Sequence, residues 1–511
     1  MTQNIYITSP IYYVNDVPHI GHAYTSIACD VLARFYRLSQ QQVYFLTGTD
    51  EHGQKVEKSA LAKNIPTQQF CDEVSQQFRH LAKTLKLSNN DFIRTSEDRH
   101  KQNVEKFWQI LCDNGYIYKG TYEGWYAVRD EAFYSPDEII DGKAPTGAEV
   151  AWHKEESYFF RLSAFQDKLL ALYQAVPDFI RPHSRYNEVV SFVNSGLKDL
   201  SISRTSFSWG IAVPGDNSSV IYVWLDALTN YLSALDFVNN GDLYQQFWCN
   251  GKPLHIVGKD ILRFHAVYWP AFLMAAGINV PFGIYAHGWW TNDGQKISKS
   301  LGNVIDPHQE IAFLQQQIND QHIAIDYFRY FLLREVPFGN DGDYSRQALI
   351  SRINAELANN IGNLIQRCFA LLQKEFINYL PRPLHSAVAL LEPYSQQFFT
   401  AMHNLSYDKA LGAIIDFANL INKRFNDTAP WNLKKQNKIS EMRECLLQTA
   451  DAIRIIAILL ASFLPHSATK ILAIFALDIN KINFANIFDI WQDGTMFNMP
   501  NQIFPRYVDN Q

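Results

Sequence analysis

The sequence predicts an α/β protein whose doubly wound parallel sheet is split by an insertion and followed by an all-α bundle. Short apolar runs of strand length alternate with apolar residues at helical spacing over residues 1–114 and again over residues 209–290. Residues 115–208 are crowded with tyrosine, tryptophan, glycine and turn residues instead. From residue 346 onward, apolar residues recur at helical spacing only. A chain of 511 residues is long enough for several cores of this kind.

The first turn of the predicted sheet carries two histidines. A strand is expected near residues 5–8, and a helix with apolar residues at helical spacing follows from Ile20. The tetrapeptide His19-Ile20-Gly21-His22 therefore lies where a parallel sheet presents ligands and where the helix N-terminus offers N–H groups to phosphate. The plain alternative is that His19 and His22 only cap the helix.

The second strand, near residues 43–47, leads into Gly48-Thr49-Asp50-Glu51-His52-Gly53. Asp50 is placed there to bind a cation such as the ammonium group of an amino acid, although an ordinary helix N-cap would look the same. Helical runs follow over residues 67–85 and 99–114. Together these elements predict the first half of a Rossmann-type nucleotide-binding fold.

The second half of the sheet is expected after the insertion of short strands and loops. Three strand-like runs are predicted there: residues 220–223, 254–257 and 282–286. The helices that follow the first two runs carry side chains suited to an aromatic slot with one polar group: Trp224, Tyr231, His265 and Trp269. Ordinary core packing would give the same pattern.

A second motif, Lys296-Ile297-Ser298-Lys299-Ser300, stands between Gly294 and Gly302. Lysines that alternate with serines in a polar segment with glycine at both ends are typical of a mobile phosphate clamp. Two solvated lysines are the alternative. With the two histidines, these lysines could hold an ATP triphosphate from both sides.

The helical region predicts a second kind of site. Helical runs cover residues 348–372, 395–425 and 440–463. Asn363 and Arg367 share one helix face, and Trp431 begins a helix next to a cluster of lysines. Single-stranded base recognition requires an aromatic platform of this kind with hydrogen-bonding groups beside it, whereas a buried tryptophan is the alternative.

Composition restricts the classes of protein that remain. The net charge of −6 argues against a general nucleic-acid binder but is compatible with a specific RNA partner. The cysteines, 6 in number, are far apart in sequence, which fits reduced thiols and gives no metal-ligand spacing. The apolar runs are shorter than a membrane span, and the first residues lack the build of a signal peptide. We therefore expect a cytoplasmic protein without a membrane segment.

These motifs, in this order, resemble those of the class I aminoacyl-tRNA synthetases and, among them, the methionyl-tRNA synthetase family. The class signature is the His-Ile-Gly-His tetrapeptide with a Lys-Met-Ser-Lys-Ser type loop, and Ile297 stands here in place of methionine. Runs that resemble the methionine family are residues 10–15, 49–53, 223–227 and 258–261, with His265, Trp269, residues 363–367 and 429–431. The resemblance implies five regions: residues 1–114 and 209–290 as halves of the catalytic Rossmann fold, 115–208 as a knuckle-like connective insertion, 291–345 as the signature-loop and stem-contact region, and 346–511 as an α-helical anticodon-binding domain.

The resemblance implies an enzyme that joins methionine to ATP as methionyl-adenylate, releases pyrophosphate, and transfers methionine to the 3'-terminal adenosine of tRNA(Met). Positioning and electrostatics carry such a reaction without a side-chain nucleophile. The implied catalytic residues are His19, His22, Lys296 and Lys299. The implied methionine-binding residues are Ile11, Tyr13, Asp50, Trp224, Ala227, Tyr231, Ile261, His265 and Trp269. The implied ATP contacts are His19, Gly21, His22, Gly258, Asp260, Lys296 and Lys299, and the implied anticodon contacts are Asn363, Arg367 and Trp431.

The resemblance also implies ATP with Mg²⁺ as the substrate complex, initiator and elongator tRNA as partners, and a monomer, because no appended C-terminal dimerisation module is seen. Leu228 stands where the family usually has proline. Many members bind zinc in the insertion through Cys-x-x-Cys pairs, but residues 127–130 and 143–146 of this chain contain no thiol. We predict a knuckle without structural zinc; stoichiometric zinc in a chelator-washed preparation would contradict this.

Two other functions remain open at this point. A small-molecule nucleotidylyltransferase with the same phosphate site would not need Asn363, Arg367 and Trp431. A non-catalytic RNA-binding relative would be expected to lose the signature histidines or lysines, and the sequence retains all of them. Methionine-dependent exchange between pyrophosphate and ATP, followed by aminoacylation of tRNA, separates the three.

Overall fold

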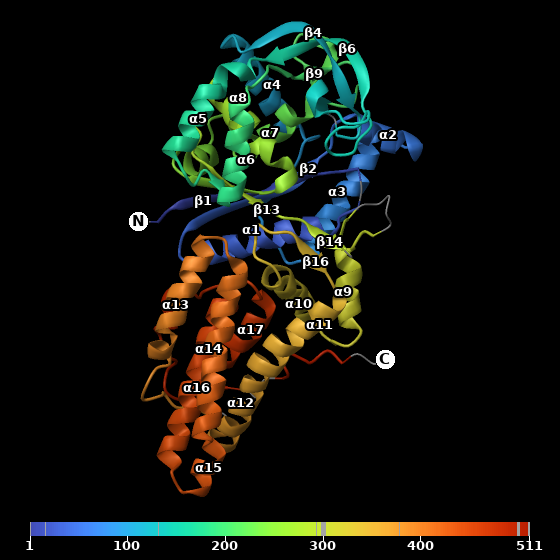
Figure 1. Cartoon of the computed structure of the whole chain (residues 1–511). Coiled ribbons are helices and arrows are strands. Elements are labelled where there is room, and N and C mark those ends of the chain that lie inside the picture. The colour runs from blue at the N-terminus through green and yellow to red at the C-terminus, as the bar shows by residue number, and fades with distance from the viewer. Residues whose placement is uncertain are drawn as a thin grey trace.

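The computed structural model describes residues 2–15, 17–130, 132–292, 294–297, 303–377, 379–497 and 501–508, without the side chains of residues 122, 132, 133, 153–155 and 296. An α/β part contains the central sheet and the insertion, and an elongated bundle of helices extends from one side of it (Figure 1). This arrangement confirms the predicted fold class.

The central sheet is parallel and has six strands. In spatial order they are β3 (Asp91–Arg94), β2 (Gln42–Asp50), β1 (Asn4–Tyr13), β12 (Lys252–Gly258), β13 (Gly283–His287) and β7 (Ile180–Arg181). Four of these, β1, β2, β12 and β13, were predicted from the sequence. The sheet changes direction of growth between β1 and β12, and such a switch point creates a crevice at the carboxyl ends of the strands.

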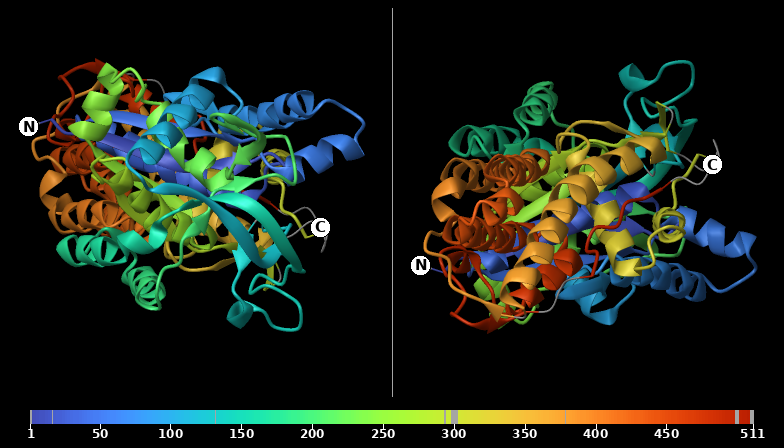
Figure 2. Two further views of the ribbon diagram at one scale, coloured as in Figure 1. Left: turned by 90° about the horizontal axis from the view of Figure 1, so that it is seen from above. Right: turned by 90° about the horizontal axis from the view of Figure 1, so that it is seen from below.

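Helices cover both faces of the sheet because its strands alternate their side chains. Ile5 and Ile7 of β1 pack with α1 (Ile20–Leu38), whereas Tyr6 packs into the core on the opposite face. The helices on that opposite face are α4 (Asp98–Asp113), α7 (Val223–Ser233) and α8 (Trp269–Ala275). Two further helices, α2 (Gln54–Ala62) and α3 (Thr67–Thr84), project from the edge of the α/β part when it is seen from above (Figure 2).

The predicted strand at residues 220–223 is not part of this sheet. The chain instead forms β11 (Asp216–Ile221), which pairs antiparallel with β10 (Ala212–Val213) and β9 (Ser203–Arg204). The reason is a tight hairpin turn, in which Gly215 adopts a left-handed conformation with φ +83°. The hairpin places β11 beside β10 and ends where α7 begins.

The insertion is built on an antiparallel sheet and also reaches back into the central one. Its strands are β4 (Ile117–Ala127), β5 (Ala132–Tyr134), β6 (Ala151–Phe160) and β8 (Leu200–Ser201). After them come α5 (Gln166–Ala175) and α6 (His183–Asn194), and β7 lies between these helices in the sequence. Because β7 pairs with β13, the insertion supplies one edge of the parallel sheet.

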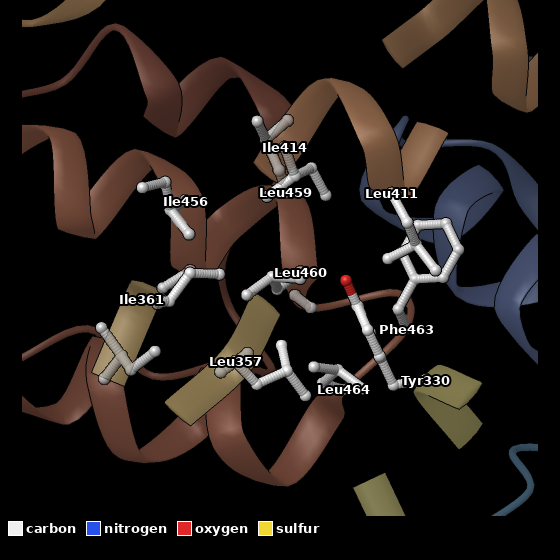
Figure 3. Close-up of a cluster of buried hydrophobic side chains, with 14 of the residues drawn as sticks. Tyr330, Leu357, Ile361, Leu411, Ile414, Ile456, Leu459, Leu460, Phe463 and Leu464 are labelled. Carbon is white, nitrogen blue, oxygen red and sulfur yellow. The ribbon is translucent and has the colours of Figure 1, made fainter. Parts of the chain in front are cut away.

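The bundle has an apolar core, part of which Figure 3 shows around Leu357, Ile361, Ile456 and Leu460. Its helices are α11 (Arg346–Arg352), a π-helical segment (Ile353–Gly362), α12 (Asn363–Phe376), α13 (Val388–His403), α14 (Tyr407–Thr428), α15 (Pro430–Lys435), α16 (Ile439–Leu460) and α17 (Pro465–Ile474). The helical run predicted over 395–425 is broken between α13 and α14, where Leu405 has φ +54°. None of the helices within the described ranges is long and apolar enough to cross a membrane.

The junction between the two parts is formed by α9 (Pro307–Gln315) and α10 (Gln321–Arg334). Arg329 of α10 is buried, and its guanidinium donates to Asp30 Oδ2 of α1 at 2.7 Å. It also donates to the carbonyl oxygens of Leu85 at 3.1 Å and Phe463 at 2.9 Å. One buried side chain therefore fixes α1, the end of α3 and the turn before α17 relative to one another.

Candidate active site

A cavity of about 390 Å³ lies at the switch point of the sheet. Its walls come from the carboxyl ends of β1, β2, β12 and β13, from the first turns of α1 and α7, and from the tip of the insertion. This is the position at which open α/β sheets bind their ligands. Most of the site residues predicted from the sequence meet here, although they come from segments far apart in the chain.

The two histidines both cap α1 and line the cavity. His19 Nδ1 accepts from the Gly21 amide at 3.1 Å, and His22 Nδ1 accepts from the His19 amide at 3.1 Å. The rings stack with centroids 3.8 Å apart. Burial, and to a smaller degree His19, lowers the pKa of His22 well below its ordinary value. Since the neutral rings accept at Nδ1, their protons are carried on Nε2, which is suited to donate to an anion.

The second signature motif approaches the cavity from β15 (Gln295–Lys296), which pairs with β14 (Trp290–Asn292). Ile297 lines the cavity. Only the backbone of Lys296 is described, and Lys299 lies outside the described residues. Downstream of the motif, the Ile305 carbonyl accepts from the Ile20 amide at 2.9 Å, so the chain returns directly to the start of α1.

A slot at one end of the cavity is walled by side chains of α7, β1 and the segment after β12. The predicted residues that line it are Ile11, Tyr13, Trp224, Ala227, Tyr231, Ile261 and His265. Trp224 is stacked on Phe264 with ring centroids 3.6 Å apart. Trp269 does not reach the cavity surface: it is fully buried, 6.1 Å behind the Tyr231 ring, and supports it from the core.

The polar groups of the slot bind one another. His265 Nδ1 lies 3.0 Å from the Ile261 carbonyl oxygen, to which it donates, and His265 Nε2 accepts from the Tyr231 hydroxyl at 2.8 Å. Burial lowers the pKa of His265 to about 4, which makes the ring neutral near pH 7. The slot therefore presents no charge and is suited to an uncharged side chain.

Asp50 is the last residue of β2 and lines the cavity beside the slot. Its neighbour Glu51 points away and forms an ion pair with Arg94 at 2.7 Å. This leaves the Asp50 carboxylate as the acidic group of the β2 end that faces the cavity. Gly48 allows β2 to approach β3 closely, because a Cβ at this position would lie 2.1 Å from the Ile93 carbonyl oxygen.

Gly258, the last residue of β12, and Asp260, which directly precedes the slot residue Ile261, also line the cavity. Asp260 Oδ1 accepts from Trp289 Nε1 at 3.0 Å. The Lys259 ammonium lies 4.2 Å from the Trp289 ring centroid and donates to Asp341 at 2.6 Å. A flat aromatic face beside a carboxylate suits a nucleoside, whose sugar hydroxyls need an acceptor.

Several lining residues were not predicted from the sequence. They include Tyr12, Tyr24, Thr25, Lys55, Arg129, Asp130, Asn230, His287 and Trp289. Thr25 Oγ1 lies 2.8 Å from His287 Nε2, which joins α1 to the end of β13. Lys55 lies in the first turn of α2, just after the run that contains Asp50, so its nearness in sequence could have pointed to it. Arg129 and Asp130 have no such signal, because their place depends on how the insertion folds over the sheet.

The comparisons with known proteins agree with this geometry. The family described as tRNA synthetases class I (M) matches residues 5–151 and 135–369. A methionine–tRNA ligase of Rickettsia bellii is 56% identical over 482 residues, or 92% of each chain, and one of Brucella suis is 47% identical over 523 residues, or 99% of this chain and 98% of that one. The Mycobacterium tuberculosis methionyl-tRNA synthetase in complex with methionyl-adenylate superposes with a TM-score of 0.93 at 43% identity, covering 99% of this chain and 100% of that one.

The chain belongs to the methionine–tRNA ligase family. This confirms the resemblance drawn from the two signature motifs.

In some members of the methionine–tRNA ligase family, thiols hold zinc in the insertion. Here Asp130 accepts from Tyr134 at 2.9 Å and also from Thr146, and Arg129 donates to Asp130 at 3.2 Å. Among the described residues, no three His, Cys, Asp or Glu side chains are grouped to hold a metal ion.

The anticodon candidates of this methionine–tRNA ligase family member lie in the bundle, on α12 and α15 (Figure 1). The Arg367 guanidinium lies 5.5 Å from the Trp431 ring centroid and donates to Asn426 at 2.7 Å. Asn363 is exposed one turn earlier on α12. Trp431 is 38% exposed, so it is not the buried core residue that the sequence also allowed.

Proposed function

We propose that this chain activates L-methionine with ATP and transfers it to tRNA(Met). The observation that carries the proposal is the meeting, in one cavity, of the His19–His22 turn, the Asp50 carboxylate and the uncharged slot. The Asp50 carboxylate suits an ammonium group, and the uncharged slot suits a thioether. The helix N-terminus at His19–His22 suits a triphosphate.

Methionine enters with its ammonium on Asp50 and its side chain between Ile11, Tyr13, Trp224, Ala227, Tyr231, Ile261 and His265, with Trp269 behind them. Contacts between sulfur and aromatic rings contribute about 0.3–1.5 kcal/mol each, so the shape of the slot shares the discrimination. Such a slot rejects close isosteres weakly, and homocysteine is the expected competitor.

ATP enters as its Mg²⁺ complex, with ribose at Gly258 and Asp260 and phosphates at His19, Gly21 and His22. Lys296 and Lys299 complete the phosphate site from the other side. A methionine carboxylate oxygen attacks the α-phosphorus, the bond to the bridging oxygen breaks, and pyrophosphate leaves with the electron pair. Cations and the dipole of α1 stabilise the charge that develops on the phosphates.

In the second step, a hydroxyl of the 3'-terminal adenosine attacks the methionyl carbonyl carbon, and AMP leaves. Asn363, Arg367 and Trp431 would bind unstacked anticodon bases, with Trp431 as the stacking surface. The five regions bounded at residues 114, 208, 290 and 345 keep the roles predicted from the sequence. We further propose a cytoplasmic monomer without structural zinc that serves initiator and elongator tRNA and does not bind membranes.

Replacing Trp431 with alanine tests the division of labour between the two parts. Trp431→Ala should lower tRNA charging by about 10-fold or more, because stacking contributes about 1–3 kcal/mol per base, and should leave methionine-dependent exchange between pyrophosphate and ATP unchanged. Phe488→Ala is the control, because it also removes an exposed aromatic ring: Phe488 is 71% exposed. It lies away from Trp431, since its neighbour Phe484 packs on Phe35 of α1. Equal losses of charging and exchange in Trp431→Ala would mean that Trp431 is structural.

A further inference from the structure

A buried carboxylate joins two walls of the cavity and a neighbouring helix without facing the cavity. Asp226 lies in the first turn of α7, between the lining residues Trp224 and Ala227. Its side chain has no exposure to solvent. Each of its two oxygens lies 2.7 Å from a histidine ring nitrogen: Nδ1 of His52 and Nε2 of His100. No step of the proposed reaction uses this cluster.

The two histidines come from the segment after β2, whose last residue lines the cavity, and from α4, which contributes no residue to the lining. His52 is two residues beyond Asp50, just after β2 ends. His100 is on α4, which packs against α7 over the sheet (Figure 1). Burial by itself would raise the pKa of Asp226, but the two histidines bring it down to about 2. The carboxylate is therefore ionised near pH 7 and can only accept, so each ring donates an N–H to it.

This cluster connects the two groups that must act on the same ligand. The end of β2 carries the carboxylate proposed to bind the methionine ammonium, and α7 carries much of the side-chain slot. The ammonium and the thioether of methionine are a fixed number of bonds apart. A shift of α7 relative to Asp50 would therefore weaken one contact when the other is made.

We propose that Asp226 is a positioning residue for methionine, which holds the end of β2 and the start of α7 at the spacing that this substrate requires. The inference rests on the proposed function, since it concerns the same site. It assigns a role in methionine affinity to three residues that do not line the cavity: Asp226, His52 and His100.

The test is the steady-state kinetics of pyrophosphate–ATP exchange. Asp226→Asn should raise the KM for methionine roughly 10- to 100-fold, because small displacements of binding groups have effects of this size. The KM for ATP should stay within about twofold, since the phosphate and ribose contacts belong to other segments. His52→Gln should raise the methionine KM in the same way, and the double variant should be no worse than Asp226→Asn alone, because both remove one connection.

The matched control is Asp451→Asn in the bundle. Asp451 is equally buried, pairs with Arg454 at 2.7 Å and accepts from Ser386 at 2.8 Å, far from the cavity. It should lower the urea midpoint of unfolding and leave the methionine KM unchanged. If Asp226→Asn behaves like this control, Asp226 is only structural and the inference is overturned. If Asp226→Asn does not fold, an unchanged methionine KM in His52→Gln overturns it instead. Absence of methionine-dependent exchange in the wild type would refute the proposed function rather than this inference.

Discussion

Single side chains of the slot owe their chemistry to burial. His265 would be partly protonated near neutral pH in water, but burial lowers its pKa to about 4. Its neutral ring can then accept from the Tyr231 hydroxyl while it donates to the Ile261 carbonyl. A charged ring in this place would favour polar ligands over a thioether.

This shift predicts a measurable dependence of stability on pH. Between about pH 6.5 and pH 4 the unfolded chain binds a proton at His265 and the folded protein does not. The free energy of unfolding therefore falls as pH falls through this window, by at most about 1.4 kcal/mol per pH unit for this group. His265→Gln should make the fall in urea midpoint between pH 7.5 and pH 4.5 smaller than in the wild type. An unchanged fall would show that His265 titrates alike in both states.

Gly48 is a second residue whose effect reaches the site through the backbone. In Gly48→Ala the new Cβ would stand 2.1 Å from the Ile93 carbonyl oxygen, so β2 and β3 must separate just before Asp50. We expect the methionine KM in the exchange reaction to rise about tenfold or more. Gly283→Ala on β13 is the control, because its Cβ meets nothing closer than 3.8 Å. A Gly48→Ala enzyme with the KM of the control would contradict this account.

At the scale of elements, the long helices and the central strands of the sheet were predicted well, whereas its two edge strands were not. The helix predicted from Ile20 is α1, and those predicted over residues 67–85 and 99–114 are α3 and α4. β3 and β7 were missed because strands of four and two residues leave no periodic pattern. Residues 220–223 have the apolar character of a sheet strand, but the turn at Gly215 directs Val220 and Ile221 into a hairpin, and Val223 already begins α7.

The residues of the candidate site also divide into those that the sequence could predict and those that it could not. Residues next to a strand end could be predicted, since strand ends of a parallel sheet share one edge, and Asp50, Gly258 and the His19–His22 turn lie there. Arg129 and Asp130 could not be predicted, because their place depends on long-range folding of the insertion. Trp269 had the spacing of a slot residue, yet burial puts it one layer behind.

At the scale of the whole molecule, Arg329 holds the α/β part and the bundle together. Its removal leaves the buried Asp30 with Arg34 and Ser88 but breaks the connection to the bundle. Arg329→Met should destabilise the protein by about 3 kcal/mol or more, seen as a lower urea midpoint. Arg352→Met is the control: Arg352 is partly exposed and pairs with Glu335 and Glu356, so its loss should cost at most about 1 kcal/mol. Equal effects would mean that the Arg329 junction is not a principal connection.

Methionine activation is the central claim, and exchange between pyrophosphate and ATP with single amino acids tests it most directly. The cavity predicts exchange that depends on methionine, with homocysteine as the nearest competitor and no comparable stimulation by leucine or valine. Subsequent charging of tRNA(Met) should use the same adenylate. Equal stimulation by leucine or valine, or no exchange with methionine, would contradict the account.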